Sequence, residues 1–252
     1  MRRLRVRTGL SGLCCAAALA LAACTPAPPG VEVWDPYEAE NRERHAANRG
    51  VDTLIAGGEG GLAGAIPPRA HRGIENFAAN AGAPADTLNF LLQGRIEPAV
   101  ATTFRFLLNS TLGIGGLFDF AGALGIEGRR TDFGETLFVW GAPEGAYLEL
   151  PFIGPATERD AAGYAVDVLI DPLNALRPGV RGRAVAARSG ARVLARIGDR
   201  AEYSDFYEAL IAESEDSYAQ ARLMYLQFRR FQLEGVARVD DFDPYDGFDP
   251  YE

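Results

Sequence analysis

The clearest structural signal in the sequence is the stretch from Pro98 to Asp119, which reads PAVATTFRFLLNSTLGIGGLFD. Its first half has residues at the three- and four-position spacing of one helix face, and these are Val100, Phe104, Leu107, Leu108 and Thr111. Proline lies near the start and Gly113 lies beyond the end, where helices favour these two residues. The stretch therefore predicts an amphipathic helix followed by a glycine-rich turn.

The glycine-rich turn allows two interpretations. Gly113, Gly115 and Gly116 could form a nest of backbone N–H groups for a phosphate, but no strand is predicted before them and no Lys-Ser/Thr pair follows. Glycines that alternate with large apolar residues such as Leu117 and Phe118 more often mark close backbone packing or a flexible elbow. We favour close packing or an elbow over a nucleotide loop.

The residues before this stretch predict two short helices. Apolar residues recur at helical spacing around residues 74–81 and again around residues 88–92. Because proline disrupts a helix interior and glycine commonly follows a helix end, Pro84 is expected to separate the two helices and Gly94 to end the second.

The residues after it predict further helices with recognisable starts. Asp132 with Glu135, and Thr157 with Asp160, have the three-residue spacing of a capping box and precede apolar runs. An arginine-rich amphipathic helix is expected around residues 185–197.

A long last helix is expected from about Glu213 to Glu234. Residues 147–151 alternate like a strand, which Pro151 closes. No stretch after residue 23 reaches the roughly 18 apolar residues of a membrane span. We therefore predict an all-α domain of short and medium amphipathic helices over residues 35–236.

The N-terminus has the layout of a secretory signal peptide. Four arginines precede an uncharged apolar run from Leu13 to Ala23, which is too short for a stable membrane span. The run closes with Leu-Ala-Ala-Cys at residues 21–24, which resembles the bacterial lipobox. We expect cleavage before Cys24, lipid on its sulfur, and a flexible tether over residues 24–34; a plain signal peptide is the alternative. By resemblance to sorted lipoproteins, Thr25 favours the outer membrane.

The C-terminus reads as a disordered acidic tail over residues 237–252. Residues 240–252 hold six acids and no base, and such a stretch repels itself. A calcium loop is disfavoured, because glycine is not at the sixth place of any Asp-x-Asp start and the chain ends before a twelfth ligand.

The charge balance argues against a nucleic-acid partner. Loss of residues 1–23 removes four arginines and no acid, so the formal net charge changes from −9 to −13. No basic stripe is present to displace counterions from phosphates. All 25 basic residues are arginine, which excludes a mechanism that needs lysine.

The sequence offers no assembled catalytic site. Cys24 is the one cysteine left after cleavage, and no serine lies in a Gly-x-Ser-x-Gly elbow. The two histidines, His45 and His71, are judged to lack neighbouring ligands, so we predict no metal site. We accordingly expect no enzyme activity and no cofactor.

A series of short motifs resembles the MlaA (VacJ) family of outer-membrane lipoproteins and runs from about residue 35 to residue 233. The matching residues are Asp35, Pro36, Glu38, Asn41, Arg42, Asn76, Phe77, Asn89, Gln93, Arg105, Phe106, Asn109, Asp119, Asp132, Phe133, Gly134, Leu137, Pro151, Gly154, Pro155, Arg159 and Asp160. The sequence departs from the family pattern near its start, at Glu40, His45 and Ala47 and in the glycine-rich run 57–61.

The resemblance implies a ring of helices within the outer membrane, with an amphipathic channel through its centre. It implies a lipid-anchored protein facing the periplasm, which takes mislocalised phospholipids from the outer leaflet and passes them to a soluble periplasmic carrier. A trimeric outer-membrane porin is the implied membrane partner. Asn109, Thr111 and the turn from Gly113 to Phe118 are then expected to border the lipid path. A scaffolding lipoprotein without lipid transfer and a lipid-cleaving enzyme are the rival interpretations.

Overall fold

The computed structural model describes residues 26–56, 66–202 and 214–240, and it is mostly helical. Its helices are α2 (Glu38–Ala56), α3 (Pro68–Leu92), α4 (Ile96–Thr111), α5 (Phe120–Ala123), α6 (Phe133–Val139), α7 (Glu158–Ile170), α8 (Pro178–Glu202) and α10 (Ser217–Asp240). A 3-10 helix, η2 (Pro172–Ala175), links α7 to α8. None of the helices in these ranges is long and apolar enough to cross a membrane.

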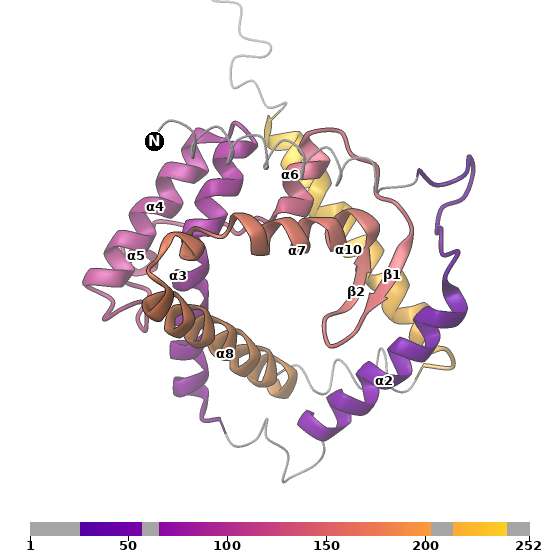
Figure 1. Ribbon diagram of the computed structural model, residues 1–252, viewed down its shortest axis with the longest axis horizontal. Helices are drawn as coiled ribbons and strands as arrows, with labels where there is room; N and C mark the ends of the chain where they lie inside the picture. The colour runs from indigo at the N-terminus through magenta and orange to yellow at the C-terminus, as the bar shows by residue number, and fades with distance from the viewer. Residues whose placement is uncertain (1–25, 57–65, 203–213, 241–252) are drawn as a thin grey trace, which may run out of the picture.

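The elements are arranged as a ring (Figure 1). Going around it, α3 contacts α8, α8 contacts α2, and α2 contacts strand β1 (Tyr147–Leu150). Strand β1 then contacts α7, α7 contacts α6, and α6 returns to α3. Helices α4 and α5 lie on one side of this cycle, against α3, and α10 lies on the opposite side. The prediction of a ring-like helical fold is therefore confirmed.

One small sheet departs from a purely helical fold. Strand β1 pairs antiparallel with β2 (Gly154–Thr157), so that Tyr147 lies opposite Thr157 and Leu150 opposite Gly154. The alternating residues 147–150 were predicted as a strand, but the partner strand was not. Its Gly-Pro-Ala-Thr sequence has little strand character, and the pairing depends on the adjoining turn and on packing against α7 and α10.

The predicted break at Pro84 was wrong, because α3 runs unbroken from Pro68 to Leu92 with Pro84 inside it. An interior proline removes one helix hydrogen bond and costs about 3 kcal/mol in an isolated helix. Helix α3 packs along both α4 and α8, and this tertiary packing offsets the local penalty. Its end was placed correctly: Gly94 has φ +77° and its N–H donates to Leu91 O.

The predicted helix starts after residues 132 and 157 are confirmed. Asp132 caps α6 by accepting a hydrogen bond from the Glu135 N–H at 2.8 Å. Thr157 caps α7 by accepting from the Asp160 N–H at 3.2 Å. Helix α10 was predicted less well: it begins at Ser217 and ends at Asp240, beyond the predicted tail boundary at residue 236. Residues 241–252 lie outside the described residues.

Within the described residues, two small clusters of buried apolar side chains form the core. One cluster joins α6 to α7 through Phe133, Leu137 and Val166. The other joins the β-hairpin to α10 through Tyr147 and Tyr218, together with Leu226. Many other buried side chains are polar or charged, and these include Asn41, Asn89, Glu135, Glu149, Arg159 and Asp160. Because buried polar groups cost free energy unless they are paired, their hydrogen-bond networks must carry part of the fold.

Candidate functional site

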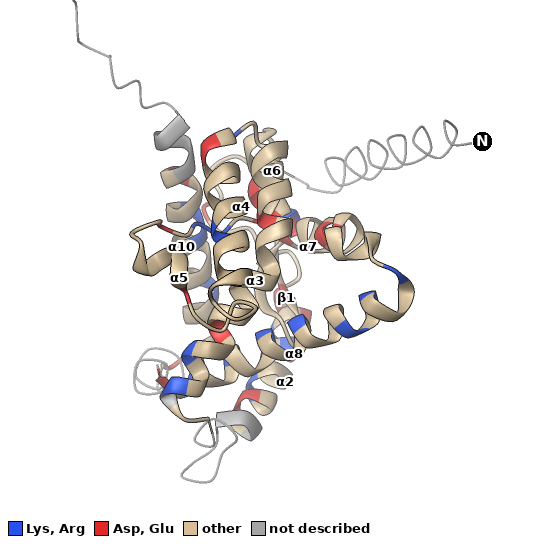
Figure 2. Cartoon of the chain, turned by 90° about the vertical axis from the view of Figure 1, so that its left-hand side faces the viewer, with Lys and Arg blue, Asp and Glu red and all other residues tan. Residues whose placement is uncertain are grey.

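The predicted apolar face of α4 is exposed. Val100, Phe104 and Leu107 retain 62%, 51% and 53% of their accessible surface. Burying one such side chain is worth about 1.5–3 kcal/mol, so leaving several in water is costly. Contiguous apolar surface of this kind marks a contact with another apolar medium or partner. Helix α4 carries only Glu97 and Arg105 as charged residues, whereas α8 carries a series of arginines (Figure 2).

An apolar pocket lies between α3 and α4 at this face. It has a volume of about 270 Å³ and is lined by Leu91, Ala99, Val100, Phe104 and Leu107 with two threonines. Large apolar side chains are also exposed on other elements of the ring, namely Phe152, Ile153, Val168, Leu169, Val180, Val193, Leu194, Phe228 and Phe231. The exposed apolar surface therefore extends beyond α4 to α7, α8, α10 and the hairpin turn.

The glycine-rich turn is closely packed against α3 and α4. A Cβ on Gly116 would lie 2.6 Å from the Asn80 side chain, and one on Gly113 would lie 2.2 Å from Phe118 O. Asn76 donates to Leu117 O at 3.3 Å. The close-packing interpretation therefore accounts for Gly113 and Gly116. The side chains of Leu117 and Phe118 are exposed.

Asn109, at the end of α4, ties the turn together. Its amide N–H donates to Asp119 Oδ1, and its carbonyl oxygen accepts from the Ala121 N–H, both at 2.9 Å. Asp119 also accepts two hydrogen bonds from Arg105 Nη2, and Thr111 donates to Leu107 O at 2.7 Å. Arg105, Asn109 and Asp119 of the predicted site thus hold the end of α4 to α5, whereas the Thr111 hydrogen bond lies within α4.

A second pocket, of about 210 Å³, adjoins the turn and has several polar and charged residues in its lining. It is lined by Asn76, Asn80, Asp86, Arg105, Phe106, Asn109, Asp119, Arg129 and Arg130, with smaller residues. Asn80 donates to Ser110 at 2.9 Å, while its own carbonyl oxygen is buried without a hydrogen-bond partner among the described residues. Burial raises the pKa of Asp86 to about 7, against the opposing effect of the Arg130 and Arg192 guanidinium groups.

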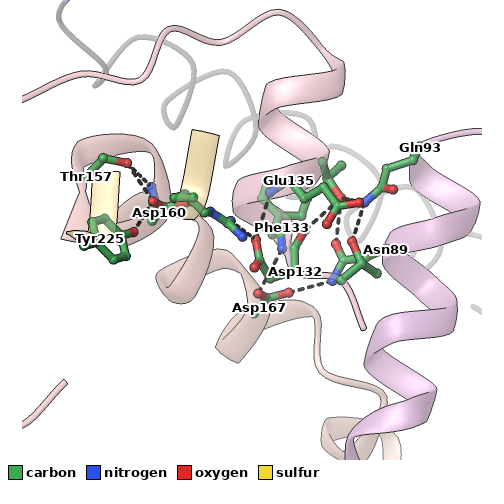
Figure 3. Close-up of polar contacts among 12 residues, drawn as sticks. Asn89, Gln93, Asp132, Phe133, Glu135, Thr157, Asp160, Asp167 and Tyr225 are labelled. Atoms are coloured by element: carbon green, nitrogen blue, oxygen red, sulfur yellow. Dashed lines mark hydrogen bonds and ion pairs between the residues drawn. The ribbon is translucent and has the colours of Figure 1, made fainter. Parts of the chain in front are cut away.

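A buried polar network joins α3 to α6 and α7 (Figure 3). Asn89 donates to Asp167 at 2.8 Å and accepts from the Thr136 hydroxyl at 3.0 Å. Gln93 donates to the same hydroxyl at 3.0 Å, and Asp167 accepts from the Phe133 N–H at 3.0 Å. The family-motif residues Asn89, Gln93 and Phe133, far apart in sequence, are therefore brought together.

A second network centres on Asp160 and reaches α10. Arg229 bridges Asp160 at 2.8 Å and Asp132 at 2.7 Å. The hydroxyls of Thr157 and Tyr225 also donate to Asp160. Burial opposes ionisation of Asp160, yet the Arg229 charge and these hydrogen bonds hold its pKa below the ordinary value. The predicted site residues omitted Arg229, although the run Tyr225-Leu-Gln-Phe-Arg229 also fits the family resemblance.

The helices α6 and α7 cross closely at this network. A Cβ on Gly134 would lie 2.6 Å from Asp160, and one on Gly163 would lie 2.4 Å from the Gly134 nitrogen. Leu137 is fully buried beside them. Arg159 is buried too, donates to Ala142 O at 3.4 Å, and has a pKa lowered by burial. Glycine at 134 and 163 thus permits the close approach that the Asp160 network requires.

A third network fastens α2 to the hairpin and α10. Asn41 donates to Asp35 at 2.9 Å and to Tyr147 O at 3.1 Å, and it accepts from the Glu149 N–H at 2.9 Å. Arg42 bonds to Glu38 and, bidentately, to Asp216.

The remaining motif residues lie around these networks. Pro36 is exposed beside Asp35, and Phe77 is half-buried on α3. Pro151 begins the hairpin turn, where Gly154 has φ +95° and Pro155 lies opposite Glu149. Cys24 lies outside the described residues, as do residues 57–61. The motif residues therefore form several connecting clusters, in place of one catalytic constellation.

The prediction of no metal site overlooked Glu75, which lies four residues after His71. Glu75 follows His71 by one helical turn, and Asp199 of α8 lies beside them, so that one ligand atom from each falls within 4.8 Å of the others. Burial and the adjacent Asp199 carboxyl raise the pKa of Glu75. Both histidines are buried.

A closed cycle of helices, held by buried polar networks and carrying exposed apolar faces, defines an amphipathic helical ring protein. Among known families this architecture has a clear match. The chain belongs to the MlaA lipoprotein family, whose model matches residues 33–232.

Individual relatives agree with this assignment. The chain is 34% identical over 173 residues to the intermembrane phospholipid transport system lipoprotein MlaA of Escherichia coli, covering 68% of this chain and 66% of that one. It is 32% identical over 193 residues to an uncharacterized protein of Rickettsia felis, covering 76% and 75%. A solved structure described as "Structural basis for maintenance of bacterial outer membrane lipid asymmetry" matches with a TM-score of 0.65 and 31% identity, covering 79% of this chain and 98% of that one.

Proposed function

We propose that this chain is a non-enzymatic outer-membrane lipoprotein that maintains lipid asymmetry. It removes mislocalised phospholipids from the outer leaflet and passes them through an amphipathic channel to a soluble periplasmic carrier. A trimeric porin holds it in the membrane. The relatives named for intermembrane phospholipid transport support the lipid substrate and the envelope location.

The observation that carries this proposal is the exposed apolar face of α4, continued on other elements of the ring. Helices that cannot span a bilayer, yet expose large apolar side chains, are suited to lie within it or at its interface. The same ring also carries polar side chains. A path for a phospholipid needs both kinds of surface, because the headgroup is polar and the acyl chains are apolar.

Anchoring is proposed at Cys24 after removal of residues 1–23. Residues 24–34 then act as a tether, residues 35–236 as the ring domain, and the chain after it as an acidic tail. A fully acylated cysteine gives stable attachment, because each buried CH2 contributes about 0.8 kcal/mol. The turn from Gly113 to Phe118 stays a predicted part of the lipid path, and the exposure of Leu117 and Phe118 is compatible with acyl-chain contact.

The proposal is tested by site-specific photo-crosslinking in outer-membrane vesicles with labelled phospholipid. A crosslinker at Val100 or Phe104 should capture lipid, whereas one at the exposed, charged Glu43 of α2 should capture much less. Equal capture at all three positions would contradict a lipid-facing α4.

The rivals predict different outcomes when the gene is deleted or the protein is purified. A scaffold would leave outer-leaflet phospholipid unchanged while an envelope complex falls apart. A lipid-cleaving enzyme would release free fatty acid from phospholipid. The proposed function predicts phospholipid accumulation in the outer leaflet and no fatty-acid release.

A further inference from the structure

The junction between α3 and α8 buries one histidine against a helix backbone. His71 of α3 lies directly on α8 at Gly198, where an added Cβ would fall 2.0 Å from His71 Cδ2. His71 Nε2 is 3.0 Å from Ala195 O, to which it donates when it carries the ring proton. The imidazole position is therefore fixed by close packing.

Carboxylates converge on this imidazole from both helices. His71 Nε2 lies 3.3 Å from Asp199 Oδ1 and 3.9 Å from Glu75 Oε1. His71 Nδ1, on the other side of the ring, lies 3.8 Å from Glu202 Oε2. Both Asp199 and Glu75 are only half-buried, so their carboxylates can rotate and reach solvent.

These separations fit the ligand set of a small metal ion. With metal–ligand bonds of about 2.0–2.2 Å, ligand atoms around a tetrahedral Zn²⁺ lie about 3.3 Å apart. The nitrogen–oxygen pair of His71 and Asp199 already has this spacing, at 3.3 Å, whereas Glu75 Oε1, at 3.9 Å from the same nitrogen, must move about 0.6 Å closer to it. An imidazole nitrogen beside carboxylates favours Zn²⁺ and similar transition metals over Mg²⁺ or Ca²⁺.

We propose that His71, Glu75 and Asp199 bind a divalent transition metal, with Zn²⁺ the expected ion, and that the ion fastens α3 to α8. Water completes the coordination. The neutral imidazole binds the ion through Nε2, so its single ring proton lies on Nδ1, beside the Glu202 carboxylate, and the Nε2 hydrogen bond to Ala195 O is replaced by the metal bond. The site concerns the integrity of the ring and does not depend on the lipid path.

The chain supplies its own control in His45. This histidine is also buried, and its Nδ1 lies 3.6 Å from a carboxylate oxygen of Glu149. That carboxylate is fully buried and already accepts hydrogen bonds from Tyr147 and Asn48. His45 therefore lacks the convergent half-buried carboxylates that surround His71.

The test is a titration of the acylated mature chain, purified in detergent without a histidine tag, with ZnCl2 in a calorimeter. One ion per chain should bind and raise the Tm. Binding should weaken at least tenfold in His71→Ala and in Asp199→Asn and stay unchanged in His45→Ala. No binding, or unchanged binding in Asp199→Asn, overturns the proposal.

Folding is controlled by circular dichroism. If His71→Ala loses its helical signal, Asp199→Asn decides, because it keeps the side-chain shape at a position that is only half-buried. The assay involves no lipid, so its failure leaves the transport proposal untouched, and failure of the lipid crosslinking leaves the metal site untouched.

Discussion

Glycine at position 116 satisfies two separate constraints. Its φ of +95° is unfavourable for residues with a side chain, and a Cβ would meet Asn80. Gly115 has a similar φ of +70°, but open space surrounds its missing Cβ. The glycine pattern predicted close packing or an elbow, and the family resemblance implied that both positions border the lipid path; at Gly116 the structure shows the close packing.

Substitutions at Gly115 and Gly116 can therefore distinguish the cost of a left-handed backbone from the cost of a steric clash. Gly115→Ala should lower the free energy of unfolding by about 1–2 kcal/mol, the usual cost of a left-handed conformation. Gly116→Ala should lower it further, because Asn80 must also move away from Ser110. Urea denaturation of both variants checks this; equal losses would show that Asn80 yields without cost.

Asp160 gives a second residue-scale prediction. Its interaction with Arg229 is buried, and removing one partner of a buried ion pair typically costs about 3–5 kcal/mol. Asp160→Asn should therefore lose stability on this scale at pH 7. Because the folded-state pKa is depressed, the wild-type contribution is present above the unfolded pKa of about 3.9 and is lost as the pH falls below it. Urea midpoints at pH 7 and pH 3 should differ less in the variant than in the wild type.

Asp86 should show the opposite pH dependence. Its folded-state pKa is raised to about 7, so between about pH 4 and pH 7 the folded chain holds a proton that the unfolded chain releases. The contribution of Asp86 to the free energy of unfolding therefore falls as the pH rises from about 4 to about 7, because the folded chain must give up this proton. The groups that face it are Arg130, Arg192 and Asp167. Asp86→Asn should be relatively more stable at pH 8 than at pH 5, as measured by thermal midpoints of both proteins. A constant difference between the two pH values would show that Asp86 stays ionised.

At the scale of single elements, the sequence predicted those features that depend only on residues a few positions apart, such as helix caps. The caps at Asp132 and Thr157 depend on residues three positions away, and both formed as expected. The predicted break at Pro84 did not form. The local sequence shows the cost of a proline inside a helix, but it does not show the contacts of α3 with α4 and α8 that outweigh this cost. The β2 strand, the Arg229 bridge and the His71 cluster also depend on distant segments, which explains why sequence reasoning missed them.

The apolar face of α4 shows that the spacing of apolar residues predicts a helix face but not what that face contacts. Val100, Phe104 and Leu107 have the spacing of a core-facing stripe, but the spacing is the same whether a stripe faces protein or lipid. Replacing all three with serine should change the free energy of unfolding in detergent by at most about 1.5 kcal/mol, since exposed substitutions usually cost no more than about 0.5 kcal/mol each. Binding to phospholipid vesicles should fall several-fold in a flotation assay. Leu137→Ser, at a fully buried position, is the matched control and should unfold the protein; unchanged flotation of the triple variant would contradict a membrane-facing α4.

At the scale of the whole molecule, the ring is closed by several separate contacts. These are the three polar networks and the junction between α3 and α8. The Asn89 network joins α3 to α6 and α7, the Asp160 network joins these to α10, and the Asn41 network joins α10 and the hairpin to α2. Arg200 then pairs with Asp52 at 3.0 Å between α8 and α2. A ring with little apolar core can hold one shape in this way, because networks of paired buried polar groups favour the arrangement in which those pairs form.

The proposed lipid attachment at Cys24 also bears on the whole molecule, since on that proposal the anchor sets the location of the protein while the ring sets its shape. The contacts described above that hold the ring together join residues 35–240, so Cys24→Ala should leave the circular dichroism and thermal midpoint of the purified chain unchanged. In cells the same variant should leave the outer-membrane fraction, because lipid attachment directs and holds it there. Combining Cys24→Ala with the triple serine variant of α4 measures what the ring itself contributes to membrane attachment. If the anchor were the whole attachment, the two non-acylated proteins would bind vesicles equally; if the apolar faces also enter the bilayer, the combined variant should bind several-fold more weakly.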